Sequence, residues 1–136
     1  MREILFKAKT ISGNWVNGLL ANKDDKWYIS NKAGSPFAYE VRPVTLCQFT
    51  GLCDKNGKRI WENDILMAHL DDSYPEDATY KTVEWGVAGW VTCEANSIDR
   101  QYLDEFDLEH FEVVGNIFDN KELLQEESDE QISISD

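Results

Sequence analysis

The side chains that could do chemistry in this chain are two histidines, three cysteines and a large number of carboxylates. A histidine base activates a serine or cysteine nucleophile that lies beside it. Nothing in the sequence places a cysteine beside His69 or His110, and His69 sits in an apolar run typical of a core or edge strand position. The sequence therefore predicts no catalytic residue, and we expect a protein that is not an enzyme.

The three cysteines, Cys47, Cys53 and Cys93, are odd in number and contain no C-x-x-C pair. This pattern indicates neither a disulfide framework nor a zinc site. Cys47 and Cys53 lie six residues apart and flank a break in the strand pattern, so a disulfide between them is geometrically possible. Reduced thiols in a reducing cytosol are the simpler expectation.

The segment Asp71–Asp77 carries four carboxylates in seven residues, and oxygen ligands of this kind bind hard cations such as Ca²⁺. The spacing of an EF-hand, with its central glycine and terminal glutamate, is absent from the segment. We therefore interpret it as a solvated surface loop and predict no metal site and no cofactor.

The formal net charge of −13 is concentrated at one end of the chain. Residues 1–93 hold 12 acids and 11 bases, whereas residues 94–136 hold 14 acids and 2 bases. A surface of this sign repels phosphates, so direct nucleic-acid binding is not expected. Acids also alternate with apolar residues between positions 98 and 110, which gives a candidate interaction surface made of Asp99, Asp104, Glu105, Asp107 and Glu109.

The elements that position these residues are organised around the stretch from Gln48 to Leu66. Asn56-Gly57 suits a tight type I′ hairpin turn because both residue types adopt a positive φ. Gly51 and Asn63 mark further breaks in the strand pattern on either side of it. We expect a turn, a short strand at 60–61, a corner and a second strand, with the polar residues forming turns; a ligand site built from them is the alternative.

The same stretch resembles the YopX family, whose members are encoded mainly by bacteriophages and prophages. The family pattern is Gln-Tyr/Phe-Thr-Gly-Leu-x-Asp-Lys-Asn-Gly-Lys-x-Ile-Tyr-Glu-Gly-Asp-Ile/Leu, and this chain departs from it with Trp61 for Tyr and Asn63 for Gly. A closing motif, Val-Ile-Gly-Asn-Ile-Tyr-Glu-Asn in the family, is matched around Gly115. The resemblance implies two small β-rich parts, the second similar to an SH3-like barrel, and it implies no reaction.

The predicted fold class is therefore mainly all-β. We expect an N-terminal β subdomain at residues 1–45, an SH3-like β-barrel subdomain at 46–125 that ends in a short helix, and an acidic mobile tail at 126–136. Strands are predicted at 3–9, 15–21, 27–29, 64–70, 79–85, 87–93 and 111–118, with Gly115 allowing a close approach. The predicted core anchors of the second part are Trp61, Ile65, Trp85, Trp90, Val113 and Ile117.

These observations favour an uncharacterised phage or prophage accessory protein that acts as a protein-interaction or self-assembling module. One alternative is an inhibitor that imitates nucleic acid through its acidic last third. Another is a small-ligand binder that uses the aromatic residues of the first part. The chain has no signal-peptide pattern and no run of roughly 20 apolar residues, so we expect a protein of the bacterial cytoplasm with no membrane partner.

Overall fold

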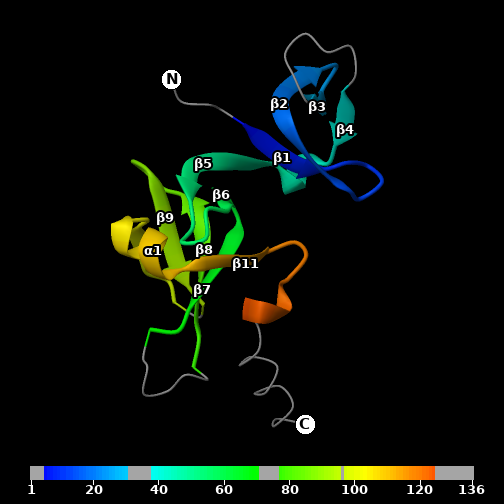
Figure 1. The fold of residues 1–136 in the computed structure, drawn as a ribbon. Coiled ribbons are helices and arrows are strands. Elements are labelled where there is room, and N and C mark those ends of the chain that lie inside the picture. Colours follow the sequence, from blue (N-terminus) through cyan, green and yellow to red (C-terminus); the bar gives the residue numbers. More distant parts are fainter. Residues whose placement is uncertain (1–4, 31–37, 71–76, 96, 125–136) are drawn as a thin grey trace. The chain divides into compact units, whose positions relative to one another are not determined.

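A computed structural model describes residues 5–30, 38–70, 77–95 and 97–124 of the chain (Figure 1). The chain divides into two units, Met1–Gly51 and Leu52–Asp136, called unit 1 and unit 2 below. The division falls within strand β5 (Cys47–Cys53), six residues beyond the boundary expected near residue 45.

Unit 1 is an antiparallel sheet whose strands follow the alternation seen in the sequence. Its hydrogen-bonded order is β4-β3-β2-β1-β5, and the far end of β5 continues into unit 2 and pairs there with β6. The core contains Ala8, Ile29 and Val41, all fully or almost fully buried. The elements are β1 (Phe6–Lys9), β2 (Trp15–Lys23), β3 (Lys26–Ser30), β4 (Tyr39–Val41) and the 3₁₀ helix η1 (Pro43–Thr45).

The β2–β3 hairpin has a two-residue turn of the type that the sequence analysis predicted at Asn56-Gly57. Asp24 and Asp25 have φ values of 55° and 64°, and the flanking Lys23 and Lys26 face each other. Two consecutive positive φ values are the mark of a type I′ turn, and Asp is among the residue types that accept them.

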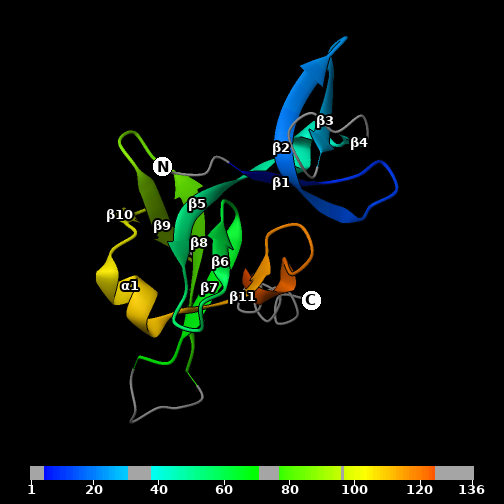
Figure 2. The same cartoon turned by 45° about the horizontal axis from the view of Figure 1, so that its top comes forward.

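Unit 2 is a second antiparallel sheet with one helix packed on it. The hydrogen-bonded order of the sheet is β10-β9-β8-β7-β11. Figure 2 shows β10 and α1 together beside β9 at one side of this sheet. The elements are β6 (Arg59–Trp61), β7 (Asp64–Ala68), β8 (Thr79–Trp85), β9 (Trp90–Glu94), β10 (Arg100–Tyr102), α1 (Glu105–His110) and β11 (Glu112–Asn116).

The described strands of unit 2 form an open sheet, and the closed SH3-like barrel expected from the family resemblance is not seen. Strands β10 and β11 lie at its two edges and do not pair with each other. The short strand predicted at 60–61 was expected to belong to the barrel of the second subdomain, but β6 pairs with β5 instead. Strand β10 takes its place, and its three polar or aromatic, exposed residues carried no strand signal in the sequence.

The core of unit 2 lies on one face of the sheet, beneath α1. Leu66 on β7 faces Lys81 on β8 and Val113 on β11, so these three side chains share that face. Ile65, its neighbour in sequence, points to the other face. The buried cluster consists of Ile60, Leu66, Ala68, Val83, Trp90 and Phe111, with Leu103, Leu108 and Val113 packed against it.

The predicted core anchors are only partly correct. Trp90 and Val113 pack in this cluster, Trp61 and Ile65 are buried outside it, and Ile117 is half-buried. Trp85 is wrong as an anchor, because 58% of it is exposed. It ends β8 at the turn into β9, where its ring packs edge-to-face against Trp90, at 4.8 Å between ring centroids. At that position the strand extends beyond the edge of the core.

The segment after β11 turns back and begins a short helix at residue 122, which confirms the helix predicted near 121–125 as far as the described residues reach. The predicted tail at 126–136 and residues 71–76 of the acidic loop lie outside the described residues. In the described ranges, no helix has the length and apolar character needed to cross a membrane.

Candidate interaction surface

The turn that follows β5 is built on the buried carboxylate of Asp54. Its Oδ1 accepts hydrogen bonds from the backbone N–H groups of Asn56 and Lys58, both at 2.9 Å, and its Oδ2 accepts one from Val113 N–H at 2.9 Å. Asp54 is only 7% exposed. One side chain therefore closes the turn and fixes it to β11, so Asp54 has a structural role and is not free to bind a ligand.

The expected type I′ turn at Asn56-Gly57 is wrong. Gly57 has a φ of 81°, but Asn56 is not among the residues with positive φ. Gly57 N–H donates to Asp54 O at 3.0 Å, and Asp54 N–H donates to Lys58 O at 2.8 Å. This is the pattern of a type I turn followed by a left-handed glycine, which the Asp54 side chain favours by capping the turn.

The corner after β6 has the backbone geometry that the sequence predicted. Asn63 has a φ of 71°, and Gly51 has a φ of 85°. Asn63 N–H donates to Val83 O at 2.7 Å, and Asn63 O accepts from Ile117 N–H at 3.0 Å. The buried Asp64 accepts from Trp61 N–H at 2.8 Å. This corner therefore joins three segments of unit 2.

Gly115 lies where a side chain would have no room. A Cβ at this position would lie 2.5 Å from Cγ of Asn120, whose Oδ1 accepts a hydrogen bond from Asn116 N–H at 3.2 Å. The sequence predicted a close approach here, and the group that approaches is an amide side chain. The neighbouring Val114 is the extra residue of a β-bulge between Val113 and Gly115.

One of the five predicted surface acids is instead part of the interior. Asp107 is 4% exposed, and its Oδ1 lies 3.0 Å from Nζ of Lys81, which is 7% exposed. The Lys81 ammonium also lies 4.8 Å from the centroid of the Phe111 ring. Asp107 and Asp104 form a capping box, each side chain accepting from the other residue's backbone N–H, which starts α1. Asp107 is therefore corrected from a surface residue to a buried structural one.

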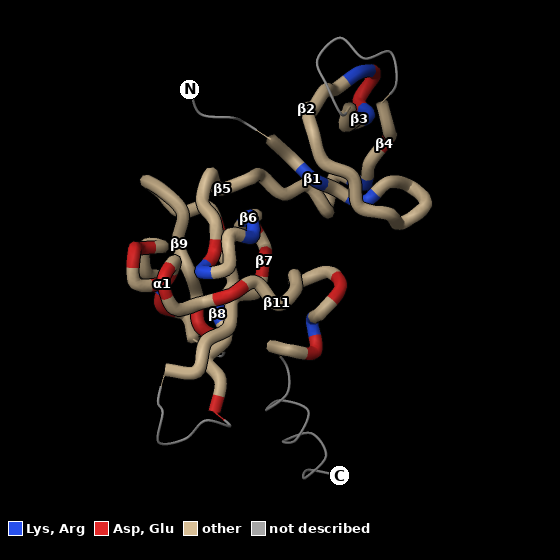
Figure 3. The backbone as a smooth tube through the Cα atoms, in the orientation of Figure 1, with Lys and Arg blue, Asp and Glu red and all other residues tan. Residues whose placement is uncertain are grey.

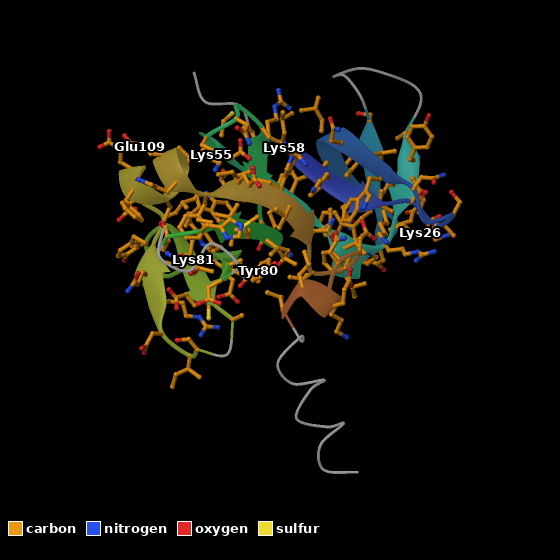
Figure 4. The ribbon with its side chains drawn as sticks, turned by 60° about the horizontal axis from the view of Figure 1, so that its bottom comes forward. Lys26, Lys55, Lys58, Tyr80, Lys81 and Glu109 are labelled. Carbon is orange, nitrogen blue, oxygen red and sulfur yellow. The ribbon has the colours of Figure 1, made fainter. Side chains whose placement is uncertain are left out.

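The other four predicted acids, Asp99, Asp104, Glu105 and Glu109, are exposed as expected. Figure 4 shows Glu109 at the outer side of α1, pointing away from the ribbon, and Figure 3 shows the acidic residues along this helix. No lysine or arginine in the described residues from 77 to 111 is left to neutralise them. Lys81 pairs with Asp107, and Nε of Arg100 lies 3.0 Å from Oε2 of Glu84.

A polar hollow lies beside the Lys81–Asp107 pair, between β8, β9, β10 and the segment that joins β9 to β10. Its volume is about 110 Å³. The Lys81–Asp107 pair contributes no net charge, so the unpaired carboxylates of Glu94 and Asp99 make the hollow negative. The lining residues are Lys81, Thr92, Glu94, Ser97, Asp99 and Gln101.

Large apolar side chains are also exposed in unit 2, and the strand register puts Trp85 and Tyr102 on opposite faces of its sheet. Tyr102 is 60% exposed, and its ring lies 3.7 Å from where a Cβ on Gly89 would be, beside the β8–β9 turn. The Trp90 ring packs edge-to-face against Trp85. Its buried Nε1–H has no hydrogen-bond acceptor among the described residues. The exposed side chains between positions 85 and 106 are Trp85, Val87, Ile98, Tyr102 and Phe106. Trp85 was missed because the sequence analysis assigned it to the core.

The histidines and cysteines are not brought together. His69 and His110 are exposed, and their Nδ1 atoms lie 3.1 Å and 2.9 Å from the backbone oxygens of Asp77 and Phe106. Cys47 and Cys93 are buried, Cys53 is exposed, and all three are free thiols. Within the described ranges, no three His, Cys, Asp or Glu side chains gather closely enough to hold a metal ion.

Fold and surface together define a mainly antiparallel β protein of two units, the second of which carries an acidic surface with exposed aromatic residues. The chain belongs to the YopX family: the family model described as YopX protein matches residues 7–125. This match confirms the family expected from the stretch between Gln48 and Leu66.

A solved structure shares this fold. The crystal structure of protein EF1440 from Enterococcus faecalis matches with a TM-score of 0.57 and 20% sequence identity, covering 91% of this chain and 99% of that one. At this level of identity the likeness concerns the fold alone.

Proposed function

We propose that this YopX protein is a non-enzymatic interaction module, an accessory protein of a phage or prophage that binds another protein in the bacterial cytoplasm. The observation that carries the proposal is the set of exposed apolar side chains in unit 2, whose residues 52–136 hold 22 acids and only 6 bases. Exposed apolar patches rimmed by polar residues are typical of protein-binding sites.

Energetic considerations support a binding role for these side chains. Burying apolar surface contributes about 25 cal/mol for each Å², so exposed aromatic residues forgo a gain that a partner would restore. Tryptophan and tyrosine are also the residue types that most often dominate the energy of a protein interface. Trp85 and Tyr102 fit this description, at 58% and 60% exposure.

The test is a search for a stoichiometric protein partner. The intact tagged chain is incubated with host lysate, treated with a short crosslinker and analysed by mass spectrometry, and the candidate partner is then purified and titrated. A saturable complex of fixed stoichiometry is expected. If no protein from the host forms such a complex, the proposal is wrong. Light scattering on the isolated chain separates binding of a partner from self-assembly.

A second candidate function is imitation of nucleic acid, and the distribution of charge between the units favours it. Residues 52–136 hold 22 acids and 6 bases, a net of −16, whereas residues 1–51 hold 4 acids and 7 bases, a net of +3. A protein with a basic nucleic-acid groove would be attracted to unit 2. Competition between the chain and DNA for the purified partner tests this function, and a partner that binds both at once would exclude it.

A further inference from the structure

We infer that two copies of this chain associate about a two-fold axis through one surface of unit 2, here called the turn–helix surface. It consists of the β5–β6 turn and the outward side of α1, with the exposed side chains Lys55, Lys58, Glu105, Phe106 and Glu109. The inference goes beyond the proposed function, because the partner is a second copy of the chain and not a host protein.

The few bases of unit 2 are concentrated at one turn. Residues 52–136 contain 6 bases, two of which form the ion pairs described above. Three of the other four are Lys55, Lys58 and Arg59, which are close together in the chain and all exposed. The β5–β6 turn is therefore a basic feature in an acidic unit.

The acidic helix α1 lies directly beside this turn. Lys55 N–H donates to the backbone oxygen of Phe111, the residue that follows α1, at 3.3 Å. Figure 3 shows the turn next to α1, and Figure 4 shows Glu109, Lys55 and Lys58 along the same side of unit 2. Opposite charges are therefore adjacent on one surface.

The outward side of α1 carries two carboxylates and an aromatic ring. The buried Asp107 points to Lys81 on the sheet, so the helical repeat turns Glu105, Phe106 and Glu109 away from it. Phe106 is 49% exposed, and its ring stacks on the imidazole of the same helix at 4.1 Å between centroids. This stacking holds an apolar ring among the charges.

The turn–helix surface is its own complement. Lys55 and Lys58 on the turn balance Glu105 and Glu109 on the helix. In the described part of the chain, no ion pair joins these four side chains. A two-fold rotation brings the turn of one copy to the helix of the other, and symmetry forms the reverse contact at the same time.

The net charge of −13 repels two copies at a distance, so they approach most easily where the local charge is balanced. A screening length of about 8 Å at 0.15 M salt weakens the long-range repulsion and leaves contacts between neighbouring side chains in place. Exposed ion pairs contribute little individually. Burial of Phe106 therefore supplies most of the affinity, and the charges set the orientation of the two copies.

Reciprocal charge reversal in the full chain tests the inference. The turn variant is Lys55→Glu with Lys58→Glu, and the helix variant is Glu105→Lys with Glu109→Lys. Each has one sign of charge on both halves of the surface, so each should dimerise about tenfold or more weakly than the unaltered chain in sedimentation equilibrium. An equimolar mixture should restore the dimer, because every altered turn and helix then meets the opposite charge.

Controls make the same changes in net charge at other exposed positions. Lys23→Glu with Lys26→Glu matches the turn variant, and Asp77→Lys with Glu122→Lys matches the helix variant. Both should keep the affinity of the dimer within about twofold, since screening limits charge effects beyond close contacts. Circular dichroism verifies that every variant is folded.

The apolar anchor is tested separately, which also serves if the helix variant does not fold. Phe106→Ser should weaken the dimer about tenfold or more. Val44→Ser removes an exposed apolar side chain from unit 1 and should leave the affinity unchanged.

Four results would overturn the inference. They are a chain that stays monomeric up to about 1 mM, a dimer that no surface variant weakens, equal weakening by the control variants, and a mixture of the two charge variants that remains monomeric. A monomeric chain that forms a stoichiometric complex with a host protein would overturn the dimer and leave the proposed function intact. A dimer without any host partner would support the inference and contradict the proposed function.

Discussion

The two ion pairs of unit 2 differ in how strongly water screens them. The side chains of Lys81 and Asp107 are 9% and 5% exposed, whereas those of Arg100 and Glu84 are 48% and 39% exposed. Removing one partner of a buried pair leaves an uncompensated charge in the interior, but an exposed charge is solvated by water.

Asp107→Asn should therefore lower the free energy of unfolding by about 3–5 kcal/mol, because Lys81 keeps its charge and loses its counter-ion. Urea denaturation measures the effect. Glu84→Gln, the matched change in the exposed pair, should cost less than about 1 kcal/mol. The double variant Lys81→Met with Asp107→Leu should recover much of the loss, and its failure to do so would show that the pair has another role.

Tryptophan burial gives a second prediction at the residue scale. Trp61 is 7% exposed and Trp85 is 58% exposed. Trp61→Ala should destabilise the protein by about 3–5 kcal/mol, whereas Trp85→Ala should cost about 1 kcal/mol or less, since most of its surface already faces water. Equal losses in urea denaturation would mean that Trp85 stabilises the fold and is not available to a partner.

At the scale of elements, short turns are fixed to strands that lie far away in the sequence. The hydrogen bond from Val113 N–H to Asp54 spans 59 residues and covers the end of β11, an edge of the second sheet. Backbone groups at a strand edge need such partners when they are removed from water.

Asp54→Ala removes the acceptor of three backbone N–H groups, and we expect it to lower the free energy of unfolding by about 3 kcal/mol. Hydrogen exchange should show faster exchange at Asn56, Lys58 and Val113 than at the centre of β8. Lys55→Ala changes an exposed residue of the same turn and should stay within about 0.5 kcal/mol. Unchanged protection at Val113 would contradict the structural role of Asp54.

The β-bulge of β11 gives a prediction about packing. Gly115→Ala forces the Asn120 side chain to move and should cost about 1–3 kcal/mol. Asn120→Gly alone loses the hydrogen bond to Asn116 N–H. If the two residues are in contact, the double variant is more stable than the sum of the single effects predicts. Additive effects would show that the clash is relieved elsewhere.

At the scale of the whole molecule, charge is divided unevenly along the chain, with a net of −16 after residue 51 and +3 before it. Like charges raise the energy of a compact state, and salt screens them: the screening length falls from about 30 Å at 0.01 M to about 8 Å at 0.15 M salt.

We therefore expect the unfolding midpoint in urea to rise as NaCl is added over this range. A variant with Asp99→Asn, Glu105→Gln and Glu109→Gln should show a smaller rise, because it carries fewer exposed charges on unit 2. A midpoint that falls with salt in the unaltered chain would mean that favourable ion pairs outweigh the repulsion.

The sequence by itself determined the features that depend on a few neighbouring residues. The positive φ angles at Gly51, Gly57 and Asn63 follow from residue type, because few side chains tolerate that backbone region. Alternation of apolar and polar residues predicted most strands, and the long motif from Gln48 to Leu66 predicted the family.

Only the tertiary structure decided burial, pairing and the location of the exposed surface. Asp107 and Lys81 lie 26 residues apart, and no local pattern distinguishes this carboxylate from its exposed neighbours Glu105 and Glu109. Trp85 and Trp90 look alike in sequence, yet Trp90 is 7% exposed in the core cluster and Trp85 is 58% exposed. Burial depends on which distant segments pack above a residue, so it is a property of the assembled sheet.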